Sequence, residues 1–221
     1  MAKDYSKEGN MKKCIMLACC LLFVFFGTAN ASLTVIGTAT YNGFSYKLIH
    51  DSDGPFGPIT WLDYTTSPSA NWQTLMNWAA SLNNPGVLSY NLNSGVQIDW
   101  DEEDWRLWSS NPYANVNTPT QSEMGDLFIN ELGNSTGLTN KGYFSNLIAN
   151  WYVSDTLSAH SYQSAILFRT DTGTLTAYGI DASYFRGMAV RPGALVPIPG
   201  AALLFASSLF GLIGIRRKIR K

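Results

Sequence analysis

Cysteine is almost absent from this chain, and its three copies are confined to one short stretch. Cys14, Cys19 and Cys20 lie in a leading apolar run, and the rest of the chain has none. Removal of that run leaves a body without disulfides, thiolate metal sites or a cysteine nucleophile. Histidine is also scarce, with only His50 and His160, and no Gly-x-Ser-x-Gly, Walker or dinucleotide-binding pattern occurs. These absences argue against the commonest nucleophilic and nucleotide-dependent enzymes.

Positive charge is scarce between the two ends of the chain. Residues 32–195 contain six basic and 14 acidic side chains, a net charge of −8, although the whole chain is at −1. An acidic body repels phosphate backbones, so we expect no nucleic-acid partner and favour cations or neutral sugars. Two of the six cations, Arg106 and Arg191, stand beside apolar residues. Each predicts a structural ion pair, because a buried arginine needs an acid.

The N-terminus carries the pattern of a secretory signal peptide. A basic start precedes a 13-residue apolar run, and small residues stand three and one positions before a cut site. The residues that define the pattern are Lys12, Lys13, Ala29, Ala31 and Ser32. The run is too short for a membrane helix of about 20 residues. We therefore predict that residues 1–31 are a signal peptide cut before Ser32, with Met11 as the true start, and that the body is exported across the inner membrane.

The C-terminus combines a second apolar run with a basic end. Gly200–Ile215 contains 16 apolar or small residues, or 21 counted from Leu195, and Arg216 opens the basic end. This length is just enough to span a bilayer. The terminal cations hold that end in the cytoplasm by the positive-inside rule. The pattern predicts a transmembrane helix with the body on the periplasmic side.

Residues 196–221 resemble a PEP-CTERM sorting signal of the Val-Pro-Leu-Pro-Ala type. The parts that carry the resemblance are Val196-Pro197-Ile198-Pro199, Leu204-Phe205, Gly211-Leu212-Ile213-Gly214 and Arg216-Arg217-Lys218. Ile198 stands where the founding motif has Glu. The resemblance implies recognition by an exosortase, a membrane protease-transpeptidase of Gram-negative bacteria that make exopolysaccharide. It also implies a transient anchor, cleavage near the proline motif, a final location at the cell surface or outside the cell, and an association with exopolysaccharide.

The body, residues 32–195, has the pattern of an α+β domain. Strands are expected where β-branched and aromatic residues gather, and helices where apolar residues recur at helical spacing. The expected strands are 33–41, 44–49, 59–64, 150–154, 163–169, 174–180 and 186–190. Asn42-Gly43 and Asp171-Thr172-Gly173 predict tight turns. Helices are expected over 71–82, capped by Ser69, and over 120–132, where Thr120 and Glu123 form a capping box.

Segments of the body resemble the DUF1566 family, also called Lcl C-terminal-like domains. They are Ile59-Thr60-Trp61-Leu62-Asp63, the helix from Trp72 to Leu82, Trp105-Arg106-Leu107, Ser122-Glu123-Met124, Trp151-Tyr152-Val153-Ser154 and Ala189-Val190-Arg191-Pro192-Gly193. The resemblance implies a C-type lectin-like fold, related to formylglycine-generating enzymes, with two helices and a mainly antiparallel sheet. It implies no settled activity, and the body lacks the cysteines on which those enzymes rely.

Two acidic segments are candidate calcium sites, because hard cations prefer several carboxylate oxygens. Asp99, Asp101 and Glu103 alternate in the densest charge run of the chain. Asp51 and Asp53, followed by a glycine, form the second candidate. The alternatives are a solvated acidic loop for the first segment and an Asx turn for the second.

Exposed aromatic residues are the candidates for stacking on sugar rings. The candidates are Trp100, Trp108, Tyr113, Tyr178 and Tyr184, and we expect the other tryptophans to pack in the core. The leading hypothesis is a non-enzymatic exported surface or matrix protein without an obligatory cofactor. The alternatives are a carbohydrate- or calcium-binding lectin-like module, and a polysaccharide hydrolase that uses a pair of carboxylates, whose separation is a three-dimensional quantity.

Overall fold

The computed structural model describes residues 33–100 and 104–196. The predicted signal peptide with Ala29, Ala31 and Ser32, and the sorting motif from Pro197 onward, lie outside these residues. No helix within the described part of the chain is both long and apolar enough to cross a membrane.

The first two strands form the hairpin that the sequence predicts. Strand β1 (Leu33–Tyr41) pairs with β2 (Phe44–Asp51) in antiparallel register, from Leu33 opposite Asp51 to Tyr41 opposite Phe44. Asn42 and Gly43 connect them with φ angles of 49° and 81°. Two successive left-handed residues make the tight turn that matches the twist of paired strands, and Asn-Gly adopts it at little cost.

Strands from both halves of the chain complete a six-stranded antiparallel sheet with the order β4-β1-β2-β3-β10-β6. Its further strands are β3 (Ile59–Leu62), β4 (Ser89–Leu92), β6 (Arg106–Leu107) and β10 (Ala189–Pro192). Strand β10 starts three residues later than expected and lies between β3 and β6. A separate pair joins β5 (Ile98–Asp99) to β11 (Ala194–Leu195).

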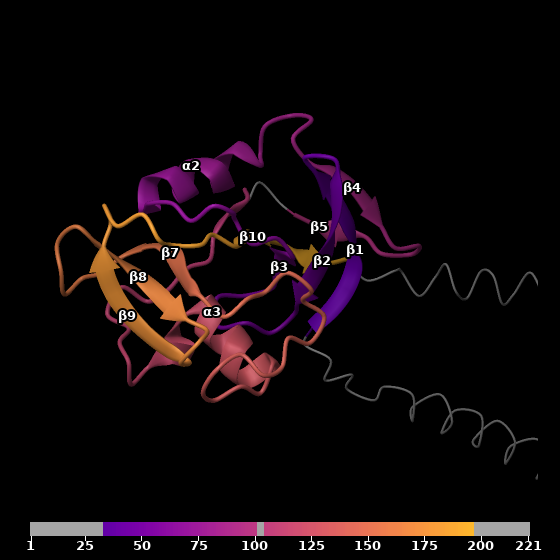
Figure 1. Cartoon of the computed structure of the whole chain (residues 1–221). Helices are drawn as coiled ribbons and strands as arrows, with labels where there is room; N and C mark the ends of the chain where they lie inside the picture. The colour runs from indigo at the N-terminus through magenta and orange to yellow at the C-terminus, as the bar shows by residue number, and fades with distance from the viewer. Residues whose placement is uncertain (1–32, 101–103, 197–221) are drawn as a thin grey trace, which may run out of the picture. The chain divides into compact units, whose positions relative to one another are not determined.

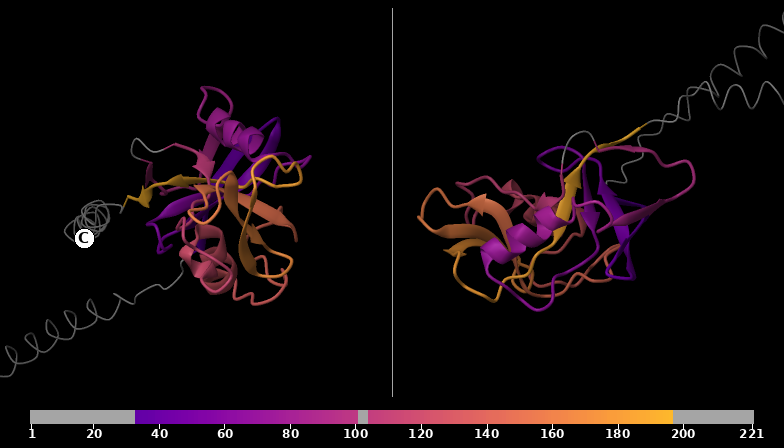
Figure 2. Two further views of the ribbon diagram at one scale, coloured as in Figure 1. Left: turned by 90° about the vertical axis from the view of Figure 1, so that its left-hand side faces the viewer. Right: turned by 90° about the horizontal axis from the view of Figure 1, so that it is seen from above.

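The second sheet contains β7 (Trp151–Leu157), β8 (Ser164–Arg169) and β9 (Thr174–Gly179) in that order. The expected turn at 171–173 joins β8 to β9. Figure 1 shows this sheet on the left and the larger sheet on the right, with helix α2 above and α3 below, and Figure 2 shows the same layers from two other sides. Antiparallel sheets with two short helices confirm the α+β class.

Helix α2 (Trp72–Ser81) corresponds to the first expected helix. Its N-cap is Asn71, whose side-chain oxygen accepts a hydrogen bond from the Thr74 amide at 2.9 Å, so the predicted cap at Ser69 is wrong. An asparagine at this position satisfies an amide that has no partner within the helix. Leu75 and Ala79 are buried on the inner face of the helix.

The second expected helix is broken into three short pieces. They are a 3₁₀ turn (Pro119–Gln121), the α-helix α3 (Glu123–Asp126) and the π-helical turn η2 (Leu127–Glu131). Ser122 caps α3 by accepting from the Gly125 amide at 3.0 Å, so the predicted capping box at Thr120 is wrong. A Cβ atom at Gly125 would lie 1.9 Å from the Pro119 carbonyl oxygen, which explains the glycine at this close approach.

The side chain of Glu123 pairs with Arg106 instead of capping the helix. The Arg106 guanidinium donates to both carboxylate oxygens, at 2.9 and 2.8 Å, and the Ser109 amide donates to Oε2 at 2.6 Å. The glutamate side chain is 1% exposed and that of Arg106 is 26% exposed. The structural ion pair expected for Arg106 is thus confirmed.

Candidate functional site

Three carboxylates from two distant parts of the chain converge beside the end of β2. Ligand atoms of Asp51, Asp53 and Glu131 lie within 4.8 Å of one another. Asp51 is buried, Glu131 is half-buried and Asp53 is exposed. One side of the cluster therefore faces the core and the other faces solvent.

Local backbone structure places each of these side chains. Asp51 is the last residue of β2, and the chain then turns so that the Asp53 amide donates a hydrogen bond to Asp51 Oδ1 at 3.4 Å. This bond is the one expected for the Asx turn, the alternative given for this segment. Glu131 ends the π-helical turn, whose Leu132 amide donates to the Leu127 carbonyl at 2.9 Å. Such wide turns recur at functional sites because they redirect a side chain that a regular helix would place elsewhere.

A fourth acid adds to the negative charge of the cluster. Asp126 precedes the π-helical turn, is buried, and accepts a hydrogen bond from the Asn130 side-chain amide. Burial raises its pKa, the Asn130 hydrogen bond lowers it, and the Asp53 charge raises it. No ion pair joins Asp51, Asp53, Asp126 or Glu131 to a cation in the described residues.

Burial and mutual repulsion raise the pKa of two of these carboxyl groups towards the neutral range. Burial raises the pKa of Asp51 to about 6, with the charges of Asp126 and Asp53 adding to the effect and the Asp53 amide opposing it. Burial also raises the pKa of Glu131 to about 7, and the charges of the three aspartates add to it. Near neutral pH the cluster therefore holds negative charge that nothing in the described residues balances.

These shifts fix the sign of the pH dependence of stability. The pKa of Asp51 rises from 3.8 to about 6 and that of Glu131 from 4.5 to about 7 on folding. The folded body then binds protons more tightly than the unfolded chain. The stability that this protonation contributes is present below about pH 4 and is lost as the pH rises through about 6 and 7.

The donor set suits a hard divalent cation. Calcium binds oxygen ligands at about 2.3–2.6 Å, so oxygens on opposite sides of the ion lie about 4.6–5.2 Å apart. The 4.8 Å spread of the three carboxylates fits that span. The cluster contains neither cysteine nor histidine, the ligands that zinc prefers.

The first predicted calcium segment lies elsewhere. Asp99 is exposed on β5, where it pairs with Ala194, and it takes no part in the cluster at Asp51. Asp101 and Glu103 lie outside the described residues. The hypothesis for that segment stays a prediction, whereas the second segment gains Glu131 as a partner that the sequence reasoning missed.

Of the aromatic residues proposed for sugar stacking, Tyr178 and Tyr184 are exposed, and the other three occupy different environments. Trp108 is fully buried, so that prediction does not hold for it: a sugar cannot reach a ring within the core. Trp100 is half-buried, and the Arg191 guanidinium lies 4.6 Å from the centre of its ring. Tyr113 is 63% exposed and makes an edge contact with His160. Only Tyr113 of the three offers a largely open ring.

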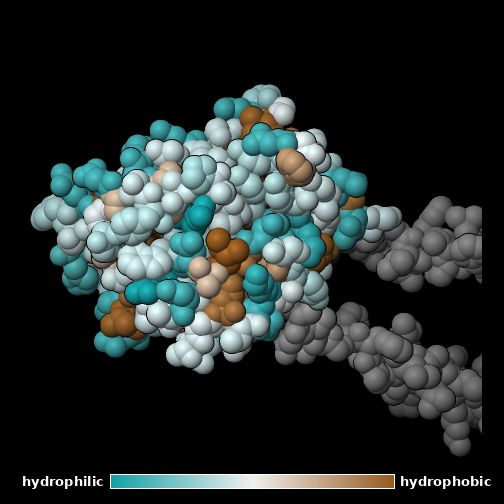
Figure 3. All heavy atoms as spheres, in the orientation of Figure 1, coloured by the Kyte–Doolittle hydropathy of each residue, from teal (hydrophilic) through white to brown (hydrophobic). Residues whose placement is uncertain are grey.

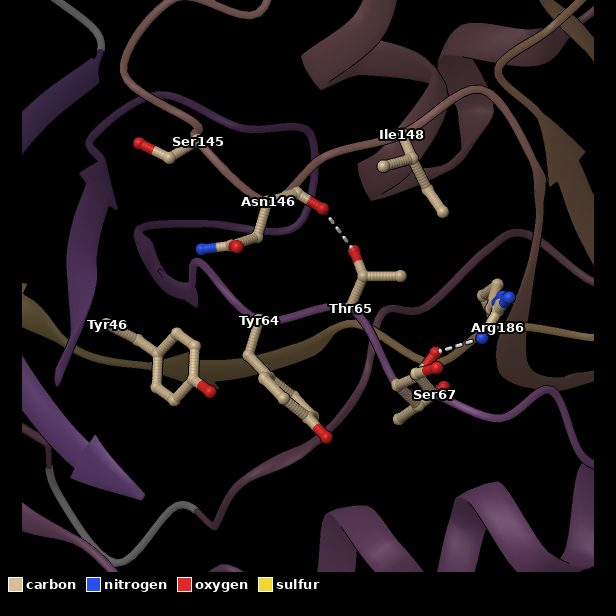
Figure 4. Close-up of a pocket in the computed structure, with 9 residues that line it drawn as sticks. Tyr46, Tyr64, Thr65, Ser67, Ser145, Asn146, Ile148 and Arg186 are labelled. Atoms are coloured by element: carbon tan, nitrogen blue, oxygen red, sulfur yellow. Dashed lines mark hydrogen bonds between the residues drawn. The ribbon is translucent and has the colours of Figure 1, made fainter. Parts of the chain in front are cut away.

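A pocket that sequence reasoning did not identify lies on another part of the body. It is lined by Tyr46, Tyr64, Thr65, Thr66, Ser67, Ser145, Asn146, Ile148 and Arg186 (Figure 4). None of the acids of the cluster is among these residues. No family model, no curated protein and no solved structure matches this chain.

Proposed function

We propose that this chain is an exported, non-enzymatic surface protein whose lectin-like body binds calcium at Asp51, Asp53 and Glu131. The observation that carries the calcium site is the convergence of three carboxylates within 4.8 Å, one of them buried, with no cation paired to them in the described residues. A divalent cation would offset their repulsion and supply the charge balance that a buried carboxylate needs.

The geometry favours a structural role for the ion. The site joins the end of β2 to the π-helical turn, two segments about 80 positions apart in sequence. An ion held by both segments stabilises the folded body over the unfolded chain, because the unfolded chain does not assemble the ligands. Calcium is plentiful outside the cell, where low-affinity extracellular sites have dissociation constants of about 10⁻⁴–10⁻³ M.

The purified chain is first freed of bound calcium with a chelator, which is then removed. Calcium added afterwards is expected to raise the melting temperature of the chain. At a free concentration of about 100 times the dissociation constant, binding to the native state contributes about 2.7 kcal/mol. For a body of this size that corresponds to a shift of roughly 5–11 °C. Scanning calorimetry with and without calcium measures the shift, and it should shrink between pH 7 and pH 5 as protons compete for the carboxylates.

Variants of the cluster separate this site from non-specific stabilisation. Glu131→Gln should raise the melting temperature of the calcium-free chain, since it removes repulsion, and should abolish most of the calcium-induced shift. Asp181→Asn removes one charge at an exposed position of another loop and is the matched control. A full calcium response in Glu131→Gln would overturn the assignment, and loss of the response in Asp101→Asn would move the site to the other acidic segment.

The location proposed for the protein rests on its two ends. The N-terminal signal pattern and the PEP-CTERM resemblance favour export followed by exosortase processing near Pro199. Mass spectrometry of the protein from its host is expected to find an N-terminus at Ser32 and a C-terminus near the proline motif, without Arg216. A mature protein that keeps the whole tail would instead be a plain single-pass membrane protein.

A further inference from the structure

A second site of different chemistry lies in the pocket formed by β2, the segment after β3, residues 145–148 and Arg186. Its volume is about 280 Å³. That is just below the range of about 300–1,000 Å³ typical of small-molecule sites, and it suits a ligand of about one sugar ring. In Figure 4, two tyrosine rings lie along one side, Ser145, Asn146 and Ile148 lie along the other, and Arg186 closes one end beside Ser67.

The two tyrosines form a fixed aromatic wall. The Tyr64 ring makes edge contacts with Tyr46 and Tyr41, at ring separations of 5.0 and 5.2 Å, and a tilted contact with Trp78 at 5.7 Å. The Trp78 indole in turn donates to the Tyr41 hydroxyl at 3.2 Å. Tyr46 and Tyr64 both remain half-buried. Held rings of this kind offer flat apolar area and a polar hydroxyl at little cost in conformational entropy.

Polar groups face this wall from a segment that is itself held in place. The amides of Ser145 and Asn146 each donate to the buried Asp63 carboxylate at 2.9 Å, and the Asn146 side-chain amide donates to the Asp63 carbonyl at 2.8 Å. The Asn146 carbonyl accepts from the Thr65 hydroxyl at 2.8 Å. These hydrogen bonds occupy the Asp63 carboxylate, while the Asn146 side-chain oxygen and the hydroxyls of Ser67 and Ser145 can bond to a ligand.

Arg186 brings a positive charge to the pocket and forms no ion pair with a described carboxylate. Its Nη1 donates to the Thr66 carbonyl at 2.6 Å, and its Nε is buried without an acceptor. In the part of the chain that the structure describes, no carboxylate forms an ion pair with it, whereas Arg106 and Arg169 both pair with acids. In a body with a net charge of −8, a half-buried arginine without an acidic partner points to an anion that is supplied from outside.

Lys47 places a second positive charge near the same pocket. Its ammonium donates to the Ser145 hydroxyl at 2.9 Å and to the Tyr143 carbonyl at 2.8 Å. No carboxylate oxygen of the described residues lies within 4 Å of this ammonium, although its charge acts on the buried Asp63 carboxylate and opposes the rise in the pKa of that group. Two of the six cations of the body thus flank one pocket. The face seen in Figure 3 carries several small, separate apolar patches among hydrophilic and neutral residues.

We propose that this pocket binds an acidic sugar, a pyranose ring that carries a carboxylate, as in a uronic acid unit of a polysaccharide. The ring packs against Tyr46 and Tyr64, its hydroxyls bond to Asn146 and the serines, and its carboxylate pairs with Arg186. A neutral sugar would leave the arginine without a partner, and a small inorganic anion would leave the aromatic wall unused. The inference does not depend on the calcium cluster or on the route of export.

Calorimetric titration of the purified chain with oligomers of galacturonic, glucuronic and mannuronic acid tests the proposal. Each oligomer is compared with its methyl ester, which keeps the ring and removes the charge. We expect at least one acid to bind at least tenfold more tightly than its ester. All titrations contain a chelator, so that carboxylates bridged by calcium at Asp51 do not contribute. Equal binding of acid and ester, or no binding of any acid, would overturn the proposal.

Two variants assign the binding to the pocket. Arg186→Gln should weaken binding of the acid at least tenfold and leave the weaker binding of the ester nearly unchanged, and Arg186→Lys should show an intermediate loss. Arg169→Gln, at a half-buried arginine on β8 that pairs with Asp171, is the matched control and should bind the acid as tightly as the wild-type chain does. Thermal unfolding of each variant checks that it folds. A folded Arg186→Gln chain with unchanged affinity would place the sugar elsewhere and refute this site.

Discussion

Replacement of Arg106 by methionine is expected to lower the free energy of unfolding by about 3–5 kcal/mol. The substitution leaves the Glu123 carboxylate, 1% exposed, without the two charge-assisted hydrogen bonds that hold it at 2.8 and 2.9 Å. A buried charge that loses its partner keeps its full desolvation penalty. The loss is a large part of the stability of a domain of this size, which is about 5–15 kcal/mol. Denaturant unfolding followed by circular dichroism measures it.

A second ion pair provides the control for this result. Arg169 and Asp171 form a bidentate pair on the surface, with both side chains about one-third exposed. Arg169→Met should cost less than about 1 kcal/mol. The double variant Arg106→Met/Glu123→Met should recover most of the stability lost in the single variant, because no unpaired charge remains. If Arg106→Met were as mild as Arg169→Met, the buried pair would not support the fold as described.

Replacement of Trp108 by alanine is expected to cost about 3–5 kcal/mol. The ring is fully buried, in one cluster with residues from both sheets and from the second helical region, including Trp61, Met124 and Ile166. Removing it deletes a large apolar surface and opens a cavity that its neighbours fill only in part. The free energy of unfolding, measured in urea, should fall by this amount, and the purified variant should bind a hydrophobic dye under conditions where the unchanged chain does not.

The variant Trp108→Phe separates two contributions to the free energy of unfolding: the packing of the ring and the unsatisfied indole nitrogen. The Trp108 indole nitrogen is buried without a partner. Trp108→Phe removes that unsatisfied donor while it keeps an aromatic ring, so the loss should be only about 1–2 kcal/mol. A near-neutral alanine variant would show that the ring is not part of the core and would restore it as a candidate for ligand contact.

The hairpin at the start of the body could be predicted because its determinants are local. Asn42 and Gly43 favour the turn on their own, and the β-branched residues beside them favour strands. The strands that sequence reasoning missed, such as β5 and β6, are two residues long. A two-residue strand shows no alternation, and it exists only because a distant strand pairs with it. The same dependence on partners moved the start of β10 to Ala189.

The candidate sites show the same division between local and distant information. Asp51 and Asp53 could be predicted as a cation site because they are two positions apart beside a glycine. Glu131 could not, because its approach depends on the π-helical turn and on packing between segments far apart in sequence. Arg186 gave no signal either, since an arginine without an acidic partner is recognised only once the positions of all the described acids are known. The expectation that Trp108 is exposed to a sugar was wrong, because the burial of a side chain depends on the whole fold and cannot be read from its neighbours in sequence.

The position of β11 has a mechanical consequence if the chain is held by its C-terminus. Tension on Val196 would first reach the hydrogen bond from its amide to the Gln97 carbonyl, and then the two residue pairs between β11 and β5. These contacts can break one after another, starting at the C-terminal end, because the force acts on one residue pair at a time. The load then passes to β10, which is held on both sides by β3 and β6 and carries the core residue Val190. Under such tension β11 would detach first, and β10 would be the strand that bears the load on the folded body.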